Sequence, residues 1–335
     1  MNLSHSKIRT FEDCSMKFKY KYINHYYASK KSANLEFGKA VHKALEKLFM
    51  EEIDPVKTFV DIWSKFEDIE LEYSRYDNFE KLMKSGRILM QDFMKNEYDK
   101  FVETLAAENW LKFDVDEQTK FFGRGDWTGK VITPDGELVT AIVDFKTSGR
   151  KYDDTKVNFN DQLTAYYHAR KRFSFDIDKV AYLVFIKTKE PKIQWLFADR
   201  TEEQEKEYLE KIREDYRQIM EGKFYREYGM SCKGCDYAPL CLGDRKKAKE
   251  ELEVFLRDEN ITLIPGETHV LGKCPPDISP MKYVKNFVKK NNIEGDFGLR
   301  VHKDYESHSQ WFDYWLDGKE LKRIYQKDKD ESEVA

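Results

Sequence analysis

Apolar residues recur with a helical period in the first third of the chain. In residues 36–52 they occupy positions 37, 40, 41, 44, 45, 48 and 49, which is the spacing of one buried helix face. Residues 54–70 begin with an aspartate and a proline, a capping residue followed by a first-turn proline, and predict a second helix. Residues 77–105 predict a third, long helix. The N-terminal part of the fold is therefore expected to be helical.

The period changes to that of strands between residues 111 and 148, where Asp135 and Gly136 predict a hairpin turn. Two further strands are predicted on either side of Glu190 and Pro191, and a helix precedes and follows them. These segments are residues 157–173 (helix), 179–189 and 192–199 (strands) and 201–222 (helix). Helices followed by strands and further helices predict an α/β fold with a mixed central sheet flanked by helices.

The pattern loosens after residues 243–260, which are rich in charged side chains. The segment from about residue 260 onward predicts a small α+β appendage, and residues 327–335 predict a solvated tail. We therefore divide the chain into one large domain, residues 1–250, and a C-terminal appendage of open role, residues 251–335.

Composition narrows the classes of protein to which the chain can belong. Lys and Arg total 58 against 62 Asp and Glu, a net charge of −4, so a nucleic-acid site must be a local basic patch. No apolar run approaches the ~20 residues that span a bilayer, and the N-terminus lacks the apolar core of a signal peptide. A cytoplasmic protein without a membrane partner is expected, and its five cysteines are then not a disulfide framework.

Asp144 and Lys146 lie two residues apart at the end of a predicted strand, so their side chains point to the same side. Asp126 lies on the neighbouring strand of the hairpin, and the two carboxylates are expected to converge. Two close carboxylates are costly unless a cation lies between them, and their oxygens suit Mg²⁺ or Mn²⁺. Lys146 would then orient a water molecule or stabilise charge that develops on a phosphate. A surface ion pair at a strand end is the alternative.

Three further polar side chains are candidates for the same site. The imidazole of His42 projects from the apolar face of the first predicted helix, one turn after Gly38. Because glycine has no side chain, the helix can approach another backbone closely at this point. A histidine satisfied within the core is the alternative. Gln162 and Tyr166 lie at i and i+4 on one helix face, where an amide and a phenol can bind a phosphate or a base edge. The polar edge of an amphipathic helix is the alternative for this pair.

Three cysteines lie close together in one predicted loop with the spacing C-x2-C-x5-C: Cys232, Cys235 and Cys241. Such a loop can surround a metal ion or cluster, but a fourth ligand is required. The candidates are Cys14, Cys274 and nearby histidines. The residues alone allow either zinc or an iron–sulfur cluster. Reduced structural cysteines are the alternative, and three in so short a loop argue against it.

Residues 16–32 combine five lysines and five aromatic residues with no acid. Such a segment suits a nucleic-acid strand, because lysines attract its phosphates and aromatic rings stack on its bases. Lys17, Lys19 and Lys21 are the candidate DNA contacts. A solvated helix or strand with a buried aromatic face is the alternative.

In chain order over roughly residues 3–245, these segments resemble the RecB-like branch of the PD-(D/E)XK nucleases. The matching motifs are LSHSKIRTFEDCSMKFKYKY, FGKAVHKALE, GRGDW, VDFKTS, QLTAY and CKGCDYAPLC. Each motif is weak alone, but six in the family's order form a specific signal. The cysteine motif resembles that of the iron–sulfur members, which include CRISPR-adaptation exonucleases and AddB-type helicase–nuclease subunits.

The resemblance implies a restriction-endonuclease-like core and a divalent-metal-dependent DNA exonuclease. Such an enzyme would act on single strands or DNA ends in recombination, repair or DNA processing. The implied ligands of Mg²⁺ or Mn²⁺ are His42, Asp126, Asp144 and the carbonyl of Phe145. Lys146 would position or activate the attacking water, and Gln162 and Tyr166 would hold the strand.

The resemblance also implies an iron–sulfur staple. A [4Fe–4S] cluster would be bound by Cys14 together with the three later cysteines, Cys232, Cys235 and Cys241. The implied partners are DNA and a helicase or another recombination or CRISPR-adaptation protein.

The chain departs from the family's pattern at two positions. Ser15 follows the first cysteine where proline is usual, and Trp127 follows the first acid where a basic or polar residue is commoner. Nothing in residues 250–335 matches the family. The alternative functions are a non-catalytic DNA-binding iron–sulfur scaffold subunit of a larger nuclease complex and an RNA-processing nuclease. The complete histidine, aspartate and lysine set argues against the scaffold.

Overall fold

The computed structural model describes residues 2–117, 119–255, 268–274, 279–291, 293–304 and 309–324. The chain forms two compact units, each discontinuous in sequence. The first contains residues 1–12 and 30–223, and the second contains residues 13–29 and 224–335. The two units are defined by how closely their residues pack. The predicted division at residue 250 into a catalytic domain and an appendage stays a prediction. Among the helices in the described ranges, none is both long enough and apolar enough to cross a membrane.

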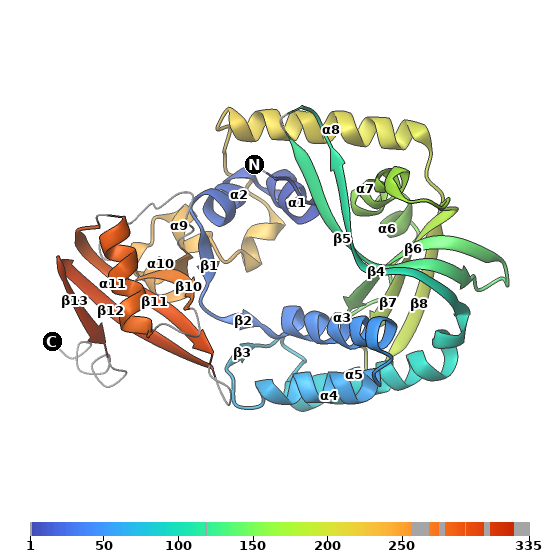
Figure 1. Ribbon diagram of the computed structural model, residues 1–335, viewed down its shortest axis with the longest axis horizontal. Coiled ribbons are helices and arrows are strands. Elements are labelled where there is room, and N and C mark those ends of the chain that lie inside the picture. Colours follow the sequence, from blue (N-terminus) through green and yellow to red (C-terminus); the bar gives the residue numbers. More distant parts are fainter. Residues whose placement is uncertain are drawn as a thin grey trace. The chain divides into compact units, whose positions relative to one another are not determined.

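A five-stranded mixed sheet forms the centre of the first unit (Figure 1). Its strands are β4 (Phe101–Asp114), β5 (Lys120–Ile132), β6 (Leu138–Ser148), β7 (Lys179–Ile186) and β8 (Lys192–Ala198). They lie in chain order, β6 and β7 run parallel, and the other neighbours run antiparallel. Gly136, with a φ of 90°, lies in the predicted hairpin turn between β5 and β6. The predicted mixed sheet is confirmed.

Three helices cover one face of this sheet: α3 (Ala33–Glu51), α4 (Pro55–Trp63) and α5 (Phe79–Asp92). Val143 and Phe145 of β6 join Phe37 and Leu45 of α3 in the buried cluster on this side. The helix predicted for residues 36–52 is therefore present, and its apolar stripe packs as its period indicated. The short strands β2 (Lys31–Ser32) and β3 (Leu71–Glu72) pair beside these helices.

Four helices pack on the opposite face: α1 (His5–Asp13), α6 (Thr155–Asn158), α7 (Asp161–Ala169) and α8 (Glu202–Met220). Ile142 of β6 belongs to this second cluster, together with Ile8 of α1 and Leu163 of α7. Alternate residues of a strand face opposite sides. Asp144 and Lys146 therefore extend the row of Ile142 and lie on the α7 side of the sheet.

The predicted helices differ from the structure in length where tertiary pairing or capping intervenes. The helix predicted for residues 77–105 ends at Asp92, two further turns follow (Phe93–Glu97 and Tyr98–Lys100), and β4 begins at Phe101. Pairing of β4 with β5 overrides the helical preference of the last predicted residues. Similarly, the helix predicted for residues 54–70 ends at Trp63 and a 3₁₀ turn (Ser64–Phe66) follows.

Asn160 divides the helix predicted for residues 157–173 into α6 and α7. Its side chain accepts the backbone N–H groups of Gln162 and Leu163 and so caps the N-terminus of α7. A 3₁₀ turn (Arg170–Arg172) ends the segment. The cap fixes the residue from which α7 starts, and with it the direction in which Gln162 points.

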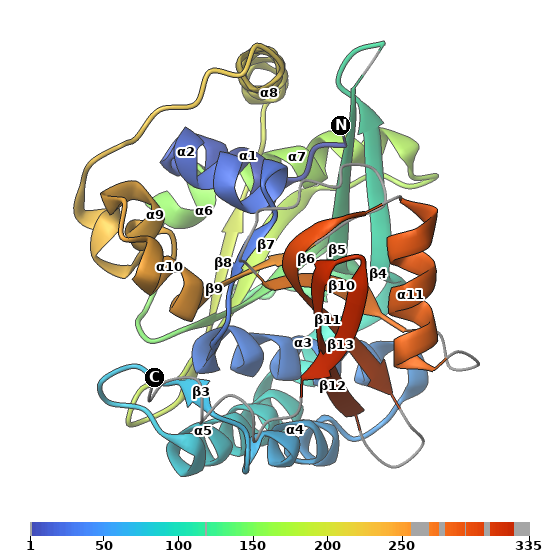
Figure 2. The ribbon, with the colours of Figure 1, turned by 90° about the vertical axis from the view of Figure 1, so that its left-hand side faces the viewer.

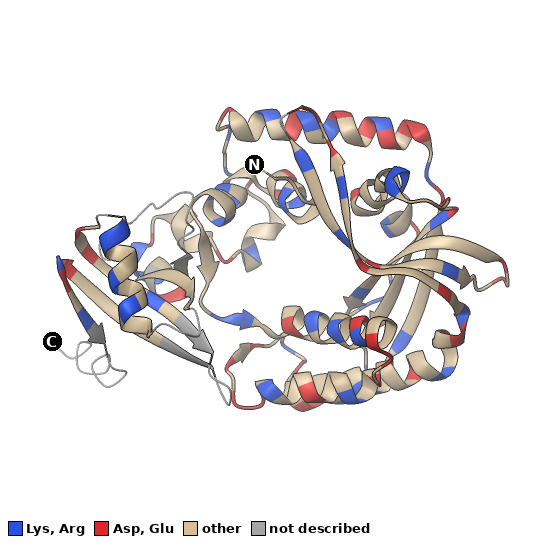
Figure 3. Cartoon of the chain, in the orientation of Figure 1, with Lys and Arg blue, Asp and Glu red and all other residues tan. Residues whose placement is uncertain are grey.

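The second unit contains a six-stranded sheet with neighbours in the order β1-β9-β10-β11-β12-β13 (Figure 2). The strands are β1 (Tyr26–Ala28), β9 (Leu252–Phe255), β10 (Thr268–Lys273), β11 (Gly295–Asp304), β12 (Ser309–Gly318) and β13 (Glu320–Ile324). Helix α11 (Pro280–Lys290) packs Val284 against Leu299 of β11. Its lysines, visible in Figure 3, are Lys282, Lys285, Lys289 and Lys290. The C-terminal segment thus combines strands with a helix, as expected.

The second unit also contains short helices and turns: α2 (Ser15–Phe18), a π turn (Lys19–Ile23), a 3₁₀ turn (Met230–Gly234), α9 (Ala238–Leu242) and α10 (Arg245–Glu251). Ser15, where the family has proline, donates its hydroxyl to the carbonyl of Tyr225 at 3.1 Å and accepts the Tyr225 N–H at 2.8 Å. Tyr237 donates to the carbonyl of Tyr26 at 2.9 Å. These bonds join residues 13–29 to the segment that begins at residue 224.

Candidate active site

Asp126 of β5 and Asp144 of β6 lie next to the last paired residues of the two strands. Trp127 lies opposite Val143 in the antiparallel register, and the two aspartates are the next residues along their strands. Side chains at facing positions of an antiparallel pair project to the same side. Both aspartates are buried, with 9% and 2% of their surfaces exposed. The two carboxylates therefore lie on the same side of the sheet on neighbouring strands, as the sequence pattern indicated.

Helix α3 brings His42 to the first of these acids. The His42 Nδ1 atom lies 3.3 Å from Asp126 Oδ1, and the other oxygen, Oδ2, accepts the N–H of Phe145 at 2.6 Å. Gly38 lies one turn earlier on the helix, where an added Cβ would be 3.2 Å from Thr147 Oγ1 of β6. A larger residue at position 38 would require the Thr147 side chain or the helix to shift by a few tenths of an ångström.

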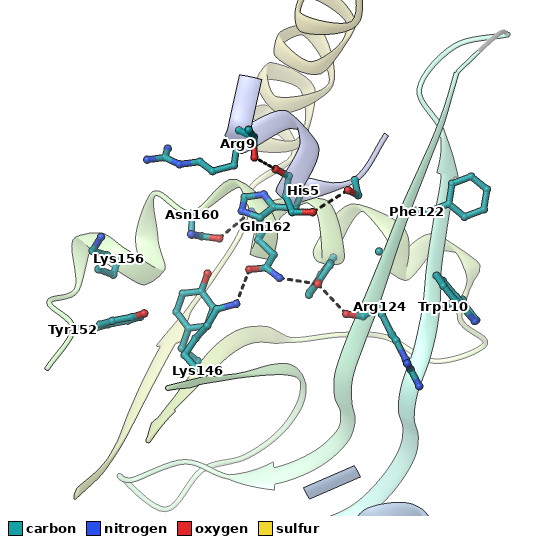
Figure 4. Close-up of a pocket in the computed structure, with 16 residues that line it drawn as sticks. His5, Arg9, Trp110, Phe122, Arg124, Lys146, Tyr152, Lys156, Asn160 and Gln162 are labelled. Atoms are coloured by element: carbon teal, nitrogen blue, oxygen red, sulfur yellow. Dashed lines mark hydrogen bonds between the residues drawn. The ribbon is translucent and has the colours of Figure 1, made fainter. Parts of the chain in front are cut away.

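Lys146 and Gln162 form a closed polar triangle with the second acid. Lys146 Nζ lies 2.6 Å from Asp144 Oδ2 and donates to Gln162 Oε1 at 2.8 Å, while Gln162 Nε2 donates to Asp144 Oδ1 at 2.9 Å. Gln162 Nε2 also donates to the hydroxyl of Tyr166 at 2.8 Å, and that hydroxyl donates to the carbonyl of Arg124 at 2.9 Å. Figure 4 shows this chain of bonds. Gln162 and Tyr166 thus hold the lysine and the acid in place.

Burial and mutual charge control the protonation of these groups. Burial raises the pKa of Asp144 to about 6, with Asp126 adding to the rise and Lys146 opposing it. Burial lowers the pKa of Lys146, but the charge of Asp144 and its hydrogen bond outweigh this, so the net pKa is raised. His42 behaves in the same way, because Asp126 outweighs its burial. The pairing with Asp144 therefore favours the ammonium form of Lys146.

Three charged residues beside the site were not predicted from the sequence: Glu46, Glu108 and Arg124. Arg124 Nε lies 2.6 Å from Glu108 Oε2, and Arg124 Nη2 lies 3.8 Å from Glu46 Oε1. Glu46 follows His42 by one helical turn, so the spacing of α3 could have indicated it. Glu108 falls between the predicted helix and the first predicted strand, and only the pairing of β4 with β5 brings it near Asp126.

Replacement of Glu108 by glutamine is expected to remove a pH-dependent loss of stability. Burial, then the charge of Asp126, raises the pKa of Glu108 from 4.5 to about 7. The folded state therefore retains a proton that the unfolded state releases, and wild-type stability falls as pH rises from about 4.5 to about 7. The melting temperature of Glu108→Gln should exceed that of the wild type at about pH 8 and approach it at about pH 5.

Glu103→Gln on the same strand is the matched control, because Glu103 is half exposed and pairs with Lys130 at 2.7 Å. All melting curves are recorded with a chelator present. A melting-temperature difference between Glu108→Gln and wild type that is equal at both pH values would contradict the raised pKa.

The carboxylate and imidazole groups around Asp144 are of the kind that bind a divalent cation. Their side chains are not, however, positioned together as the ligands of one ion. Within the described ranges, no group of three or more His, Cys, Asp or Glu residues is close enough together to hold a metal ion. The oxygens of Asp144 are instead engaged by Lys146 and Gln162. Burial raises the pKa of Asp144, and a cation beside the two buried carboxylates would lower it again. Carboxylate oxygens and imidazole nitrogen are suitable donors for it.

The predicted DNA contacts in residues 16–32 lie in the second unit. Lys17 is in α2, and Lys19 and Lys21 are in the π turn that follows. Lys19 Nζ lies 5.8 Å from the ring centre of Phe224, and Lys21 Nζ lies 5.3 Å from that of Tyr22. Their role in binding DNA stays a prediction.

Trp127, which follows the first acid, is a core residue. Its side chain is fully buried, and its indole N–H donates to Thr104 Oγ1 at 3.0 Å. The ring packs on the α3 side of the sheet, against Phe49 and Phe101. The departure from the family at this position therefore does not alter a substrate-facing surface.

The second unit contains a cavity of about 200 Å³ that gathers the predicted cluster ligands. The cysteines that line it are Cys14, Cys232, Cys235 and Cys241. Cys274 is instead buried in the cluster between α11 and its strands. All five cysteines are described and none forms a disulfide bond. Cys14 thus lines the same cavity as the other three cysteines and Cys274 does not, but among the described residues no three of these cysteines are close enough together to hold a metal ion.

Comparison with known proteins gives one match of sequence to a family and weaker structural likenesses. Residues 2–242 match the family model described as the PD-(D/E)XK nuclease superfamily. No curated protein matches the chain. A solved structure named "Putative exonuclease" from Eubacterium rectale is 16% identical with a TM-score of 0.49, covering 78% of this chain and 91% of that chain. A second solved structure, SSO0001, is 11% identical to this chain with a TM-score of 0.32. The match covers 72% of this chain and 86% of that chain.

Proposed function

Because the chain belongs to the PD-(D/E)XK nuclease superfamily, we propose that it is a divalent-metal-dependent deoxyribonuclease that shortens DNA from its ends. Recombination, repair or another DNA-processing pathway is its proposed setting. The arrangement of Asp126, Asp144 and Lys146 supports this most directly. Two buried carboxylates lie on the adjacent strands β5 and β6, and an ammonium group lies 2.6 Å from one of them.

Members of this superfamily typically use Mg²⁺ or Mn²⁺. We propose that His42, Asp126, Asp144 and the carbonyl of Phe145 would hold such an ion here. The ion would stabilise the negative charge that develops on the phosphate oxygens during cleavage. Asp144 can take part once its carboxylate exchanges the ammonium of Lys146 for the ion.

The chain's own side chains would orient the other reactants. The ammonium of Lys146, once exchanged from Asp144, would donate a hydrogen bond to the attacking water or to the scissile phosphate. Gln162 fixes the direction of that ammonium through its 2.8 Å bond, and Tyr166 fixes Gln162 in turn. The Phe145 N–H holds one oxygen of Asp126, which leaves the other toward His42. Phosphodiester hydrolysis would follow from in-line attack of water on phosphorus.

Incubation of the full chain with end-labelled DNA tests this function. Single-stranded and duplex substrates are supplied with Mg²⁺, with Mn²⁺ or with a chelator, and the same sequence is supplied as RNA. Metal-dependent release of label from DNA ends is expected. DNA binding without cleavage under every metal condition would instead favour the non-catalytic scaffold, and cleavage of RNA alone would favour an RNA-processing enzyme.

We further propose that the protein belongs to the RecB-like iron–sulfur branch and binds a [4Fe–4S] cluster. The support is the common cavity lined by Cys14 and the C-x2-C-x5-C cysteines. Thiolates suit both iron–sulfur clusters and zinc, so the identity of the bound group must be measured. A helicase or another recombination or CRISPR-adaptation protein is the proposed partner besides DNA.

Anaerobically purified protein is expected to be brown and to lose its colour when a cluster ligand is replaced. Cys14→Ser and Cys235→Ser should each remove the colour and increase proteolysis, because residues 13–29 would lose their covalent link to the later segment. Cys274→Ala is the matched control and should stay brown, since Cys274 does not line the cavity. Iron and sulfide analysis with absorption spectra is the measurement. Brown Cys14→Ser protein would remove Cys14 from the ligand set, and a colourless wild type with one bound zinc would refute the [4Fe–4S] assignment.

A further inference from the structure

A cavity of about 750 Å³ opens beside the catalytic lysine in the first unit, and the proposed chemistry does not use most of it. Its wall comes from the start of α1, from β4 and β5, and from the segment around α6 and α7. Lys146, Gln162 and Tyr166 line its inner end. Figure 4 shows Arg9, Tyr152 and Lys156 on one side of the cavity and Trp110 and Phe122 on the other. We call this space the α1 cavity.

The charge of the α1 cavity is opposite to that of the chain as a whole. The chain has more acids than bases, yet the described lining residues include four Lys or Arg side chains and no carboxylate. Lys146 and Arg124 pair with Asp144 and Glu108. Arg9 and Lys156 line the cavity with exposed side chains, and Figure 4 shows both on the side opposite Trp110 and Phe122. Such a wall attracts an anion that extends outward from the active site.

The same cavity offers aromatic surface to solvent. Trp110 has 64% of its surface exposed, although it lies on a strand whose partner side chains could have covered it. Lys112 Nζ lies 5.6 Å from the ring centre of Trp110 and 5.3 Å from that of Phe122. An exposed ring next to cations is the combination that binds an unpaired nucleotide, because the base stacks while the phosphate is neutralised.

His5 adds a buried polar group to the wall of the cavity. Within the described structure its Nδ1 atom is buried and has no hydrogen-bond partner. Burial, then the charge of Lys146, lowers the pKa of His5 to about 4, so the ring is neutral near pH 7. A neutral imidazole that lacks a partner can accept or donate one hydrogen bond to a bound ligand.

We propose that the α1 cavity binds an unpaired stretch of the DNA strand next to the scissile phosphate, and that it makes single-stranded DNA the preferred substrate. Arg9 and Lys156 bind a phosphate of this stretch, and Trp110 stacks on one of its bases. In a duplex the bases are already stacked and paired, so they are not available to Trp110. This inference rests on the proposed nuclease function, because it names the form of DNA which that site receives.

Binding of labelled DNA by the full chain in chelator tests the proposal without cleavage. Trp110→Ala is expected to weaken binding of a single strand by at least about fivefold and to leave duplex binding unchanged. The Arg9→Ala, Lys156→Ala double variant should reduce the slope of log affinity against log salt by about 0.7 for the single strand, because one phosphate contact is lost. Tyr76→Ala and Lys192→Ala are the matched controls, since both side chains are exposed outside the cavity.

The outcomes separate this proposal from the nuclease assignment. Single-strand affinity that is unchanged in Trp110→Ala, or reduced equally for duplex, would overturn the cavity's role even if the wild type cleaves DNA. Wild-type protein that binds single strands through Trp110 but cleaves nothing with any metal would sustain the cavity's role and overturn the nuclease.

Discussion

The Asp144→Asn variant is expected to cleave DNA about a thousandfold more slowly than the wild type, or not at all, while keeping its fold. The amide has the shape of the carboxylate, and its oxygen can still accept the hydrogen bond from Gln162 Nε2 that Asp144 Oδ1 accepts at 2.9 Å. What disappears is the negative charge of this side chain on β6. A divalent ion beside Asp126 would then face one buried carboxylate where it had two, and its affinity should fall.

Mn²⁺ binding is measured by titration alongside the cleavage assay, because Asp144→Asn should weaken both metal binding and cleavage. Asp199→Asn serves as the control, since the Asp199 side chain is 78% exposed in its ion pair with Lys179. Circular dichroism establishes that each variant is folded. A folded Asp144→Asn preparation with near-normal turnover would remove Asp144 from the mechanism.

Lys146→Met is expected to separate metal binding from cleavage. Methionine has a similar length but no charge, so the oxygen of Asp144 that lies 2.6 Å from Lys146 Nζ loses its cationic neighbour. The carboxylate is then more available to a divalent ion, and Mn²⁺ should bind at least as tightly as in the wild type. Cleavage should nevertheless slow by about a hundredfold to a thousandfold, because the donor that stabilises the developing charge is gone.

The pH dependence of the residual activity gives a second readout for Lys146→Met. Burial raises the pKa of Asp144 and the charge of Lys146 opposes that rise, so the pKa of Asp144 should rise further in the variant. The ascending limb of the residual activity should therefore move to higher pH. Lys192→Met, at the exposed start of β8, should leave both rate and pH profile unchanged. Loss of Mn²⁺ binding in Lys146→Met would show that the lysine supports the ligands and not the reaction.

The sequence predicted the parts of the site that depend on local pattern. The strand period put Asp144 and Lys146 on one face, and the helix period with Gly38 directed His42 toward a neighbouring strand. The cysteine spacing indicated a common site for Cys232 and its neighbours. These features follow from the pitch of a strand or a helix, which a single segment determines.

The parts that were missed depend on pairing between distant segments. Glu108 enters the site because β4 pairs with β5, and the alanine and glutamate residues before it favour a helix in isolation. The bonds of Gln162 to Asp144, Lys146 and Tyr166 were also not predicted, while its role in holding the DNA strand stays a prediction. Its orientation depends on the Asn160 cap, which the local sequence contains, and on the distance between α7 and β6, which no local segment determines.

The discontinuous second unit has a consequence for synthesis of the protein on the ribosome. Residues 13–29 emerge early, but their partners begin at residue 224, which is 224 − 29 = 195 residues later. At about 5–20 residues per second, the wait is roughly 10–40 seconds. During this time Phe18 and Tyr26, which are buried in the finished fold, have none of their later neighbours. A nascent-chain chaperone that covers basic aromatic segments would protect this one, and any group that joins Cys14 to Cys241 can be inserted only after translation has passed residue 241.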